Sequence, residues 1–296
     1  FKERREDILT NPKRYVLAAG AVGLPPYNFG IVENKGFEME LGWNSTIGKV
    51  NYYLKGIYAF NRNKVIEKSE AAKPYPYMYE AGLPIKQFIG YQYDGFFSSY
   101  DEIASSPQQF GLTNLKPGDI KYKDINGDGI VDENDQAPIG YSTVPEMTYS
   151  LQLGASYKGF DVSVMFQGAA RSSVYLYQDL GWDNMTGNYY EEHINRWTPE
   201  TAATATYPRL TTESGTNNFY SSDFWMYKTD AFRLAKVQVT YDLPSKWFKN
   251  SFVHGVSAYI SGSDLLTISK ERKALELNVG SSPQCRFYNL GVTATF

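Results

Sequence analysis

The sequence predicts an all-β protein, an antiparallel transmembrane β-barrel, and three observations carry this prediction. Apolar and polar residues alternate along several segments, as they do in strands with one apolar face. Aromatic residues make up 16% of the chain, with 25 tyrosines and 17 phenylalanines, and rings suit strands better than helices. Short turns alternate with long loops along the chain, which is typical of barrels that span a membrane.

The alternation defines the strands in chain order. In residues 149–157, tyrosine, leucine and alanine point one way, and serine, glutamine and glycine point the other. The predicted strands are a stub before Asp7 and residues 37–47, 50–60, 149–157, 160–167, 235–241, 256–260 and 288–296. We expect the apolar faces to contact lipid through Leu151, Leu153, Val162, Val164, Val237, Val239, Leu290 and Val292. We expect the opposite faces to line a polar interior through Glu38, Glu40, Lys55, Asp161, Lys236 and Gln238.

The connections between these strands differ greatly in length. Short or moderate connections are expected at residues 46–49, 158–159 and 244–255. Long loops rich in Gly, Pro, Ser, Asn and Tyr are expected at residues 8–35, 62–146, 170–225 and 264–284. Loops of such length are uncommon in compact domains and are usually functional.

Composition excludes several classes of protein. The net charge of -3 and the pI near 5.6 supply no basic field, so nucleic acid is not an expected partner. Cys285 is the only cysteine, which excludes an intrachain disulfide and a thiolate metal cluster. The chain begins FKERREDILT, without a signal peptide or a starting methionine, so we expect a piece of a longer protein.

A soluble β-sandwich that binds carbohydrate also has alternating strands, and it stays open as an alternative. Tyr58, Tyr157 and Tyr241 lie at strand ends, where a membrane barrel carries a girdle of aromatic residues. This placement favours the barrel.

Several sequence segments resemble the C-terminal barrel portion of SusC/RagA-type TonB-dependent transporters of the Bacteroidetes outer membrane. The segments are ENKGFEMEL, IGYQYDGFF, PGDIKYKDINGDGIVDENDQAPIG, VSVMFQGAA, RWTPETAATATYPRL, FRLAKVQVTYDLP, AYISGSDLLT and YNLGVTATF. The resemblance covers nearly all of residues 1–296. It implies about the last eight strands of a larger plugged barrel, whose plug, earlier strands and TonB-binding segment lie outside this sequence.

The resemblance also implies a function. Such transporters import oligosaccharides or peptides across the bacterial outer membrane, work with a SusD-like surface lipoprotein, and draw energy through TonB. If the last strand runs toward the periplasm, the loops at 62–146 and 170–225 lie outside the cell. Aromatic residues of these loops are expected to stack on sugar rings, to contact the lipoprotein, or to pack against one another; they are Tyr75, Tyr77, Tyr79, Trp182, Tyr189, Tyr190, Trp197, Phe219, Tyr220 and Trp225.

A calcium-type loop lies within the first long loop, with the sequence DINGDGIVDEND. Its spacing matches a twelve-position calcium template with ligands at Asp124, Asn126, Asp128, the Ile130 carbonyl, Asp132 and Asp135. Oxygen ligands on a glycine-containing turn suit calcium better than magnesium, which keeps its waters. The alternative is an acidic turn without an ion, whose side chains bond nearby backbone amides.

No enzyme is expected. His193 and His254 are the only histidines, and neither lies in a nucleophile, zinc-protease or phosphate-loop motif. A second membrane protein stays open as an alternative to the transporter. It is a self-contained small outer-membrane barrel that acts as a surface binding or structural protein, since seven strands and a stub could form a closed eight-stranded barrel.

Overall fold

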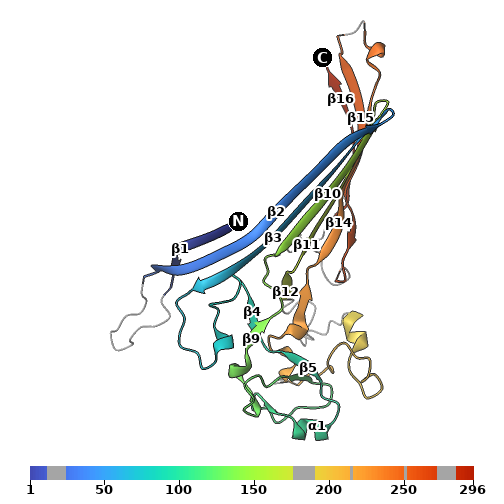
Figure 1. Ribbon diagram of the computed structural model, residues 1–296. Helices are drawn as coiled ribbons and strands as arrows, with labels where there is room; N and C mark the ends of the chain where they lie inside the picture. Colours follow the sequence, from blue (N-terminus) through green and yellow to red (C-terminus); the bar gives the residue numbers. More distant parts are fainter. Residues whose placement is uncertain (12–24, 176–190, 214–215, 250–251, 272–284) are drawn as a thin grey trace.

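Eight antiparallel strands form one large sheet, and a compact layer of loops lies at one end of it (Figure 1). The computed structural model describes residues 1–11, 25–175, 191–213, 216–249, 252–271 and 285–296. The strands follow the order β1 (Lys2–Thr10), β2 (Tyr27–Ile47), β3 (Val50–Glu67), β10 (Met147–Tyr157), β11 (Phe160–Ala170), β14 (Ala231–Asp242), β15 (Gly255–Ile268) and β16 (Phe287–Thr295). The predicted all-β class and the predicted eight strands are confirmed.

Some strands are longer than the alternation predicts. The first half of β2 pairs with β1, from Lys2 opposite Lys35 to Thr10 opposite Tyr27, so the expected loop at 8–35 is wrong at both of its ends. β15 continues to Ile268, so the expected loop at 264–284 begins too early. Both extensions are held by backbone pairing and carry mixed side chains, so period-two alternation does not reveal them.

The register places the apolar residues of neighbouring strands side by side. One row of directly opposite partners runs from Trp43 through Leu54, Leu153 and Val164 to Val237. A second row joins Val162, Val239, Ile260 and Leu290. The eight residues predicted to face lipid therefore share one face of the sheet, and its outermost members stay open, with Leu290 83% and Val292 70% exposed.

Aromatic rings border this apolar face at both ends. At the end near the loop layer, the ring of Phe232 lies 6.3 Å from that of Tyr149 and 5.3 Å from that of Phe166. At the end with the short turns, the rings of Phe160 and Tyr241 lie 4.4 Å apart. Tyr149 and Tyr157 mark the two borders on β10 and are separated by about 27 Å of extended strand.

The sheet is open and sheared. Among the described residues, β1 and β16 form no hydrogen-bonded pair, and the two chain ends lie far apart in Figure 1. β3 runs on to Glu67, well past Phe60, which lies opposite the first residue of β10. β16 begins at Phe287, opposite Ser263, although β15 continues to Ile268. Successive strands are thus shifted toward the short turns, as in a barrel with tilted strands.

Within the described ranges, no helix has the length and apolar character needed to cross a membrane.

Two-stranded ladders and short helices make up the loop layer. They are β4 (Phe88–Gly90) with β9 (Ala137–Ile139), β5 (Tyr93–Phe96) with β7 (Ile120–Tyr122), β6 (Gln108–Gln109) with β8 (Ile130–Val131), and β12 (Ser173–Tyr175) with β13 (Met226–Lys228). The helices are α1 (Tyr100–Ser105) and the 3₁₀ turns η2 (Pro76–Met78), η3 (Glu133–Asp135), η4 (Glu191–Asn195), η5 (Asn217–Phe219), η6 (Asp223–Trp225) and, at the far end of the sheet, η7 (Ser245–Trp247).

Tyrosine rings cover glycines on neighbouring strands, and this packing generates a prediction. The Tyr53 ring lies over Gly154, where an added Cβ would come within 2.1 Å of ring carbon Cε1. We expect Gly154→Ala to destabilise the sheet by about 1–3 kcal/mol because the ring must move. Heat-dependent loss of the folded band in gel electrophoresis of the full transporter measures it. Gly56→Ala, at a site with no atom within 4 Å, is the control. The packing argument would be contradicted if Gly154→Ala left the midpoint temperature of unfolding unchanged. It would also be contradicted if adding Tyr53→Ala to Gly154→Ala did not restore part of the lost stability.

Candidate functional site

The two long loops fold together into one body, here called the loop domain, which comprises the described residues from 68–146, 171–175 and 191–230. Its core joins Tyr91, Ile120, Tyr122 and Val131 of the first loop to Tyr207 and Trp225 of the second, with each side chain at most 5% exposed. Tyr93, Phe96, Phe110 and Phe224 pack around this core. Burial raises the pKa of Tyr91 and Tyr122, so both stay neutral and act as packing groups with a polar tip.

A buried polar cluster joins the same two loops. Asp119 is fully buried, and its carboxylate lies 2.7 Å from Nε of Arg209. The side chain of Asn218 donates to Asp119 at 2.8 Å and accepts the Ile120 amide at 2.8 Å. Trp225 donates its indole N–H to the Asn218 carbonyl at 3.0 Å. These bonds fix the first loop against the second at a point that water does not reach.

An ion-pair network closes the first loop at the sheet. Arg62, on β3, makes a bidentate pair with Glu146, at 2.6 Å and 2.8 Å, just before β10 begins. Arg171, just after β11, lies 3.5 Å from the same carboxylate. Glu146 is only 8% exposed, and its hydrogen bonds raise the pKa of Arg62. The loop domain is therefore joined to three adjacent strands by one buried carboxylate.

Most of the loop aromatics that the structure describes serve packing. Trp225 is 2% exposed, and Phe219 packs on the domain core. The Tyr220 ring stacks on Phe110 at 3.8 Å, and Trp197 lies against Gly118. Trp182, Tyr189 and Tyr190 lie outside the described residues. Of the three expected roles, mutual packing of the loops is the one these contacts support.

The calcium-type loop is tightly ordered by its own side chains. Both oxygens of Asp124 accept backbone amides, from Gly127 at 2.6 Å and Gly129 at 2.8 Å. Asp135 is fully buried and accepts amides from Ile125 at 2.7 Å and Asp132 at 2.9 Å. Gly127 and Gly129 have φ of 77° and 87°, where a side chain would be strained.

The remaining members of the loop complete this network. Asn126 accepts the Asp128 amide, Asp128 accepts the Ile130 amide, and Asp132 accepts the Asn134 amide, all between 2.8 and 2.9 Å. Within the described residues, no group of three or more acidic, histidine or cysteine side chains converges as a metal centre. The side-chain-to-amide bonds are those of the acidic-turn alternative, and Oδ1 of Asp135 accepts a second amide, from Asn126 at 3.3 Å. Calcium binding stays a prediction.

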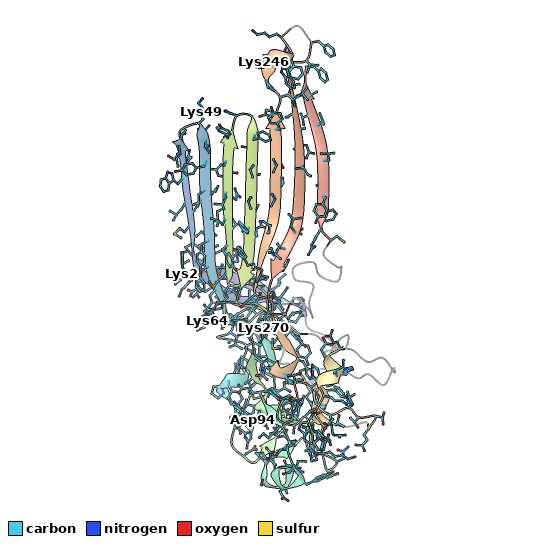
Figure 2. All side chains as sticks on the ribbon, turned by 90° about the vertical axis from the view of Figure 1, so that its right-hand side faces the viewer. Lys2, Lys49, Lys64, Asp94, Lys246 and Lys270 are labelled. Carbon is cyan, nitrogen blue, oxygen red and sulfur yellow. The ribbon has the colours of Figure 1, made fainter. Side chains whose placement is uncertain are left out.

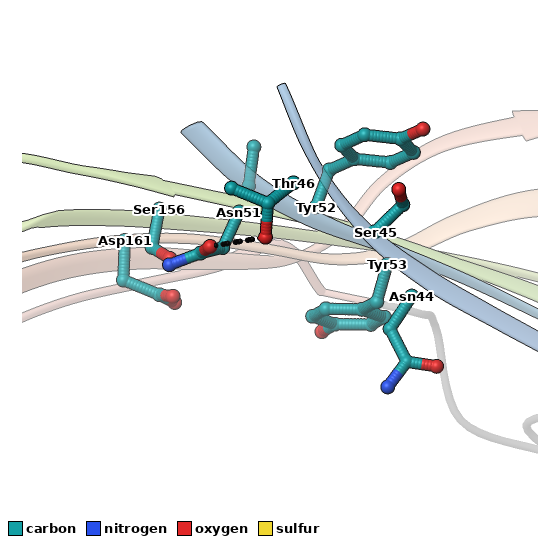
Figure 3. A pocket seen from close by; sticks show the side chains of 9 residues that line it. Asn44, Ser45, Thr46, Asn51, Tyr52, Tyr53, Ser156 and Asp161 are labelled. Carbon is teal, nitrogen blue, oxygen red and sulfur yellow. Dashed lines mark hydrogen bonds between the residues drawn. The ribbon is translucent and has the colours of Figure 1, made fainter. Parts of the chain in front are cut away.

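Hollows lie on the opposite, polar face of the sheet. One, of about 580 Å³, lies near the short turns and is lined by residues that include Asn44, Thr46, Asn51, Tyr53 and Asp161 (Figure 3). Asn44, Tyr53 and Asp161 project to one side of the sheet, and Thr46 donates to Asn51 at 2.7 Å. Smaller hollows of about 340 and 140 Å³ lie farther along the same face, beside Arg233 and Lys236.

The residues predicted for a polar interior all belong to this face. Glu40 pairs with Lys55 at 2.8 Å, and Asp161, Lys236 and Gln238 lie along β11 and β14. Figure 2 shows side chains along the full height of the sheet and a dense group of them in the loop domain around Asp94. His193 is buried against the Tyr207 ring, whereas His254 lies at the far end of the sheet, where its amide donates to Thr295.

Loss of the Asp119 carboxylate should loosen the loop domain. We expect Asp119→Ala to cost about 3–5 kcal/mol because it removes the close partner of the largely buried Arg209 guanidinium and leaves it only Glu213, at 3.7 Å. Limited proteolysis of the folded transporter measures this as faster cleavage in residues 68–146. Glu80→Ala, which removes an exposed pair with Lys68, is the control and should cost about 1 kcal/mol or less. Equal cleavage of the two variants would show that the cluster does not hold the loops together.

Calcium occupancy is testable because Tyr77 donates its hydroxyl to the Asn134 carbonyl at 2.7 Å, within reach of the loop. We expect terbium bound in the loop to emit when tyrosine is excited, and calcium to displace it with a Kd of about 10⁻⁴ to 10⁻³ M. Asp128→Ala and Tyr77→Phe should both lower the signal. Asp101→Ala, which removes an exposed acid on α1, should not. Equal terbium emission from Asp128→Ala and Asp101→Ala would contradict ion binding in this loop and support the acidic turn without an ion.

Comparison with known proteins shows what this arrangement resembles. No family model matches the chain. TonB-dependent receptor P26 of Formosa agariphila is 28% identical in an alignment that covers 91% of this chain and 30% of that receptor. TonB-dependent receptor P3 of the same organism is 22% identical and covers 91% of this chain. The chain thus spans about a third of the length of these relatives.

Solved structures give the same answer for the fold. A chain of the RagAB peptide importer in its open-open state superposes on all of this chain with a TM-score of 0.75, at 18% identity and over 32% of its own length. A second RagAB structure superposes with a TM-score of 0.74 at 19% identity. The predicted resemblance is confirmed: in sequence and in fold, this chain is similar to a portion of a TonB-dependent transporter of the SusC/RagA type.

Proposed function

We propose that this chain is part of a TonB-dependent importer of the bacterial outer membrane, in which its eight strands form a segment of the barrel wall. The observation that carries the proposal is the sheet itself. It has one apolar face bordered by aromatic rings, one polar face with hollows, and two edges that no other described strand pairs with, and RagAB chains have the same fold over its whole length.

The dimensions of the apolar face support a position in the bilayer. The aromatic borders are about 27 Å apart along the strands, which a tilt of 35–45° reduces to roughly 20 Å. A barrel of this class has an apolar band of about 25 Å between two aromatic girdles. Residues such as Leu54, Leu153 and Val164 would then contact lipid tails, and no helical segment is needed to hold the protein in the membrane.

The loop domain would face the outside of the cell and the short turns the periplasm. Outer-membrane barrels have short periplasmic turns and longer extracellular loops, and the loop domain lies opposite the turns at Gly48 and Gly159. The polar face would line the lumen, where the hollow beside Asn44 and Asp161 would receive polar groups of the plug. The plug, the earlier strands and the TonB-binding segment would belong to other parts of the same transporter.

The external partner would be a SusD-like surface lipoprotein, and the cargo oligosaccharides or peptides. Support for the partner comes from the loop domain, which presents a prefolded surface held by the Asp119 and Glu146 clusters. RagAB is named a peptide importer, whereas the receptors of Formosa agariphila carry no cargo in their names. The relatives are receptors and transporters, which agrees with a chain that performs no chemistry; calcium, if bound, would stiffen the loop domain.

The alternatives fit the geometry less well. A self-contained eight-stranded barrel requires β1 to pair with β16, and the described strands leave both edges open. A soluble carbohydrate-binding sandwich requires a second sheet over the apolar face. Among the described residues no second large sheet exists, and Trp43 and Leu41 remain 66% and 61% exposed.

A gene deletion with complementation tests the proposed import. Cells that lack the full transporter should lose growth on the oligosaccharide or peptide that it imports, and the intact gene should restore it. A variant of the full transporter whose TonB-binding segment is removed should insert normally and fail to restore growth. Restored growth without that segment would contradict TonB-dependent import.

A charge on the apolar face should block membrane insertion. We expect Val164→Arg to destabilise the inserted barrel by about 2–4 kcal/mol, since arginine at mid-bilayer has no partner. Ser163→Arg places the same charge on the polar face and is the matched control. Urea titration of the full transporter folded into vesicles measures both. A larger cost at Ser163 than at Val164 would reverse the assignment of the two faces.

A further inference from the structure

The connection between β14 and β15 differs from the other turns at its end of the sheet. It spans residues 243–254 and carries the 3₁₀ turn η7, where the Trp247 amide donates to the Pro244 carbonyl at 3.0 Å. Trp247 is 64% exposed and Phe252 77% exposed. Phe252 stacks on Phe296, with ring centroids 5.5 Å apart and planes 11° apart. Three large rings are therefore exposed here, and two of them, Phe252 and Phe296, stack on each other.

The same connection is basic. Residues 243–254 contain Lys246, Lys249 and His254 and no acidic residue. In the part of the chain that the structure describes, neither lysine has an ion-pair partner. The other two turns at this end also carry an exposed lysine each, Lys49 and Lys158, and Figure 2 shows Lys49 and Lys246 at the same end of the sheet. Positive charge thus follows this border of the apolar face.

The stacked rings continue the apolar face. Phe296 lies two alternating positions beyond Val292, on the side of the sheet that holds Leu290 and Val292. Strands that tilt by 35–45° are shifted by roughly one residue from one strand to the next at constant depth. Phe160 on β11 and Phe296 beyond β16 are three strands apart. Over three strands, a position at the same depth therefore moves by roughly three residues toward the short turns, which is the direction in which successive strands of this sheet are shifted. Phe296 and Phe252 would therefore lie near the depth of the Phe160 and Tyr241 border.

We propose that residues 243–249, Phe252 and Phe296 form an anchor for phospholipid at the bilayer surface, an inference that rests on the proposed position of the sheet in the membrane. Trp247, Phe252 and Phe296 would occupy the boundary between headgroups and acyl chains, where amphipathic rings are favoured. Lys246 and Lys249 would extend their ammonium groups to lipid phosphates. Bilayer lipid is the occupant that matches both the basic charge and the continuity of these rings with the apolar face.

Quenching by brominated lipids locates Trp247. The full transporter is reconstituted in vesicles, and the fluorescence that is lost in Trp247→Phe is taken as the Trp247 signal. We expect this signal to be quenched most by bromines near the headgroup and little by aqueous iodide. Trp43, isolated in the same way through Trp43→Phe, lies within the apolar face and should be quenched by bromines deeper in the acyl chains.

The two tryptophans separate failure of the anchor from failure of the membrane assignment. Iodide quenching of Trp247 together with lipid quenching of Trp43 would overturn the anchor and leave the proposed function standing. Iodide quenching of both would overturn both. Trp247→Phe preserves an aromatic ring, and a heat-resistant folded band checks that the barrel is intact.

Lipid affinity tests the lysines independently. Native mass spectrometry of the full transporter titrated with phosphatidylglycerol measures the lipid that it retains. We expect Lys246→Gln with Lys249→Gln to weaken the tightest phosphatidylglycerol binding by about fivefold for each lysine removed. Lys123→Gln with Lys228→Gln removes the same charge from the loop domain and should change nothing. Equal binding by the two double variants would overturn the anchor.

Discussion

The hydrogen-bonded ladder between the eight strands is the interaction on which the rest of the structure depends. Inside a bilayer, each backbone N–H and C=O must find a partner within the protein, because no water is present to replace one. In the described residues, the ladders from β1 to β16 meet this demand along most of the sheet, apart from a few register shifts and the two outer edges. Once the ladder fixes the register, alternate side chains must face opposite sides, which separates the apolar row of Leu153 and Val164 from the polar row of Gln152 and Ser163. In the proposed transporter, further strands would pair with these two edges and close the wall.

The loop domain follows different rules from the sheet. Its stability comes from a small aromatic core and from buried polar contacts, chiefly Asp119 with Arg209, between segments about 90 residues apart in the chain. Glu146 couples this body to β3, β10 and β11 through Arg62 and Arg171. The sheet and the loop domain are therefore two separately packed bodies, joined at the Glu146 carboxylate. Because the loop domain has its own core, most of the described loop aromatics pack inside it.

The sequence predicts the sheet well and the loop domain poorly. Alternation is a local signal, so residues 149–157 and 160–167 are predicted almost to their ends, as β10 and β11. The first half of β2 is missed because its partner β1 carries charges on both faces, such as Arg4 and Arg5, and pairing alone holds it. The hydrogen bond between Ile120 and Asn218 joins residues that are 98 positions apart, and no local sequence pattern predicts such a contact. The acidic loop at Asp124 is predicted as a turn by its glycines, whereas its occupancy depends on ion binding that spacing alone does not determine.

Accessibility along β10 tests the central claim, that this sheet is a wall between lipid and lumen. Spin labels are placed one at a time at residues 148–153, 155 and 156 of the full transporter in vesicles, with Cys285→Ser to remove the native thiol. We predict that collisions with oxygen, which is enriched in lipid, peak at Leu151, Leu153 and Ala155. Collisions with a water-soluble nickel chelate should peak at Ser150, Gln152 and Ser156, out of phase with oxygen and with a period of two. A chelate signal that is uniformly high at both sets of positions would contradict the account, because it would place both faces of the sheet in water.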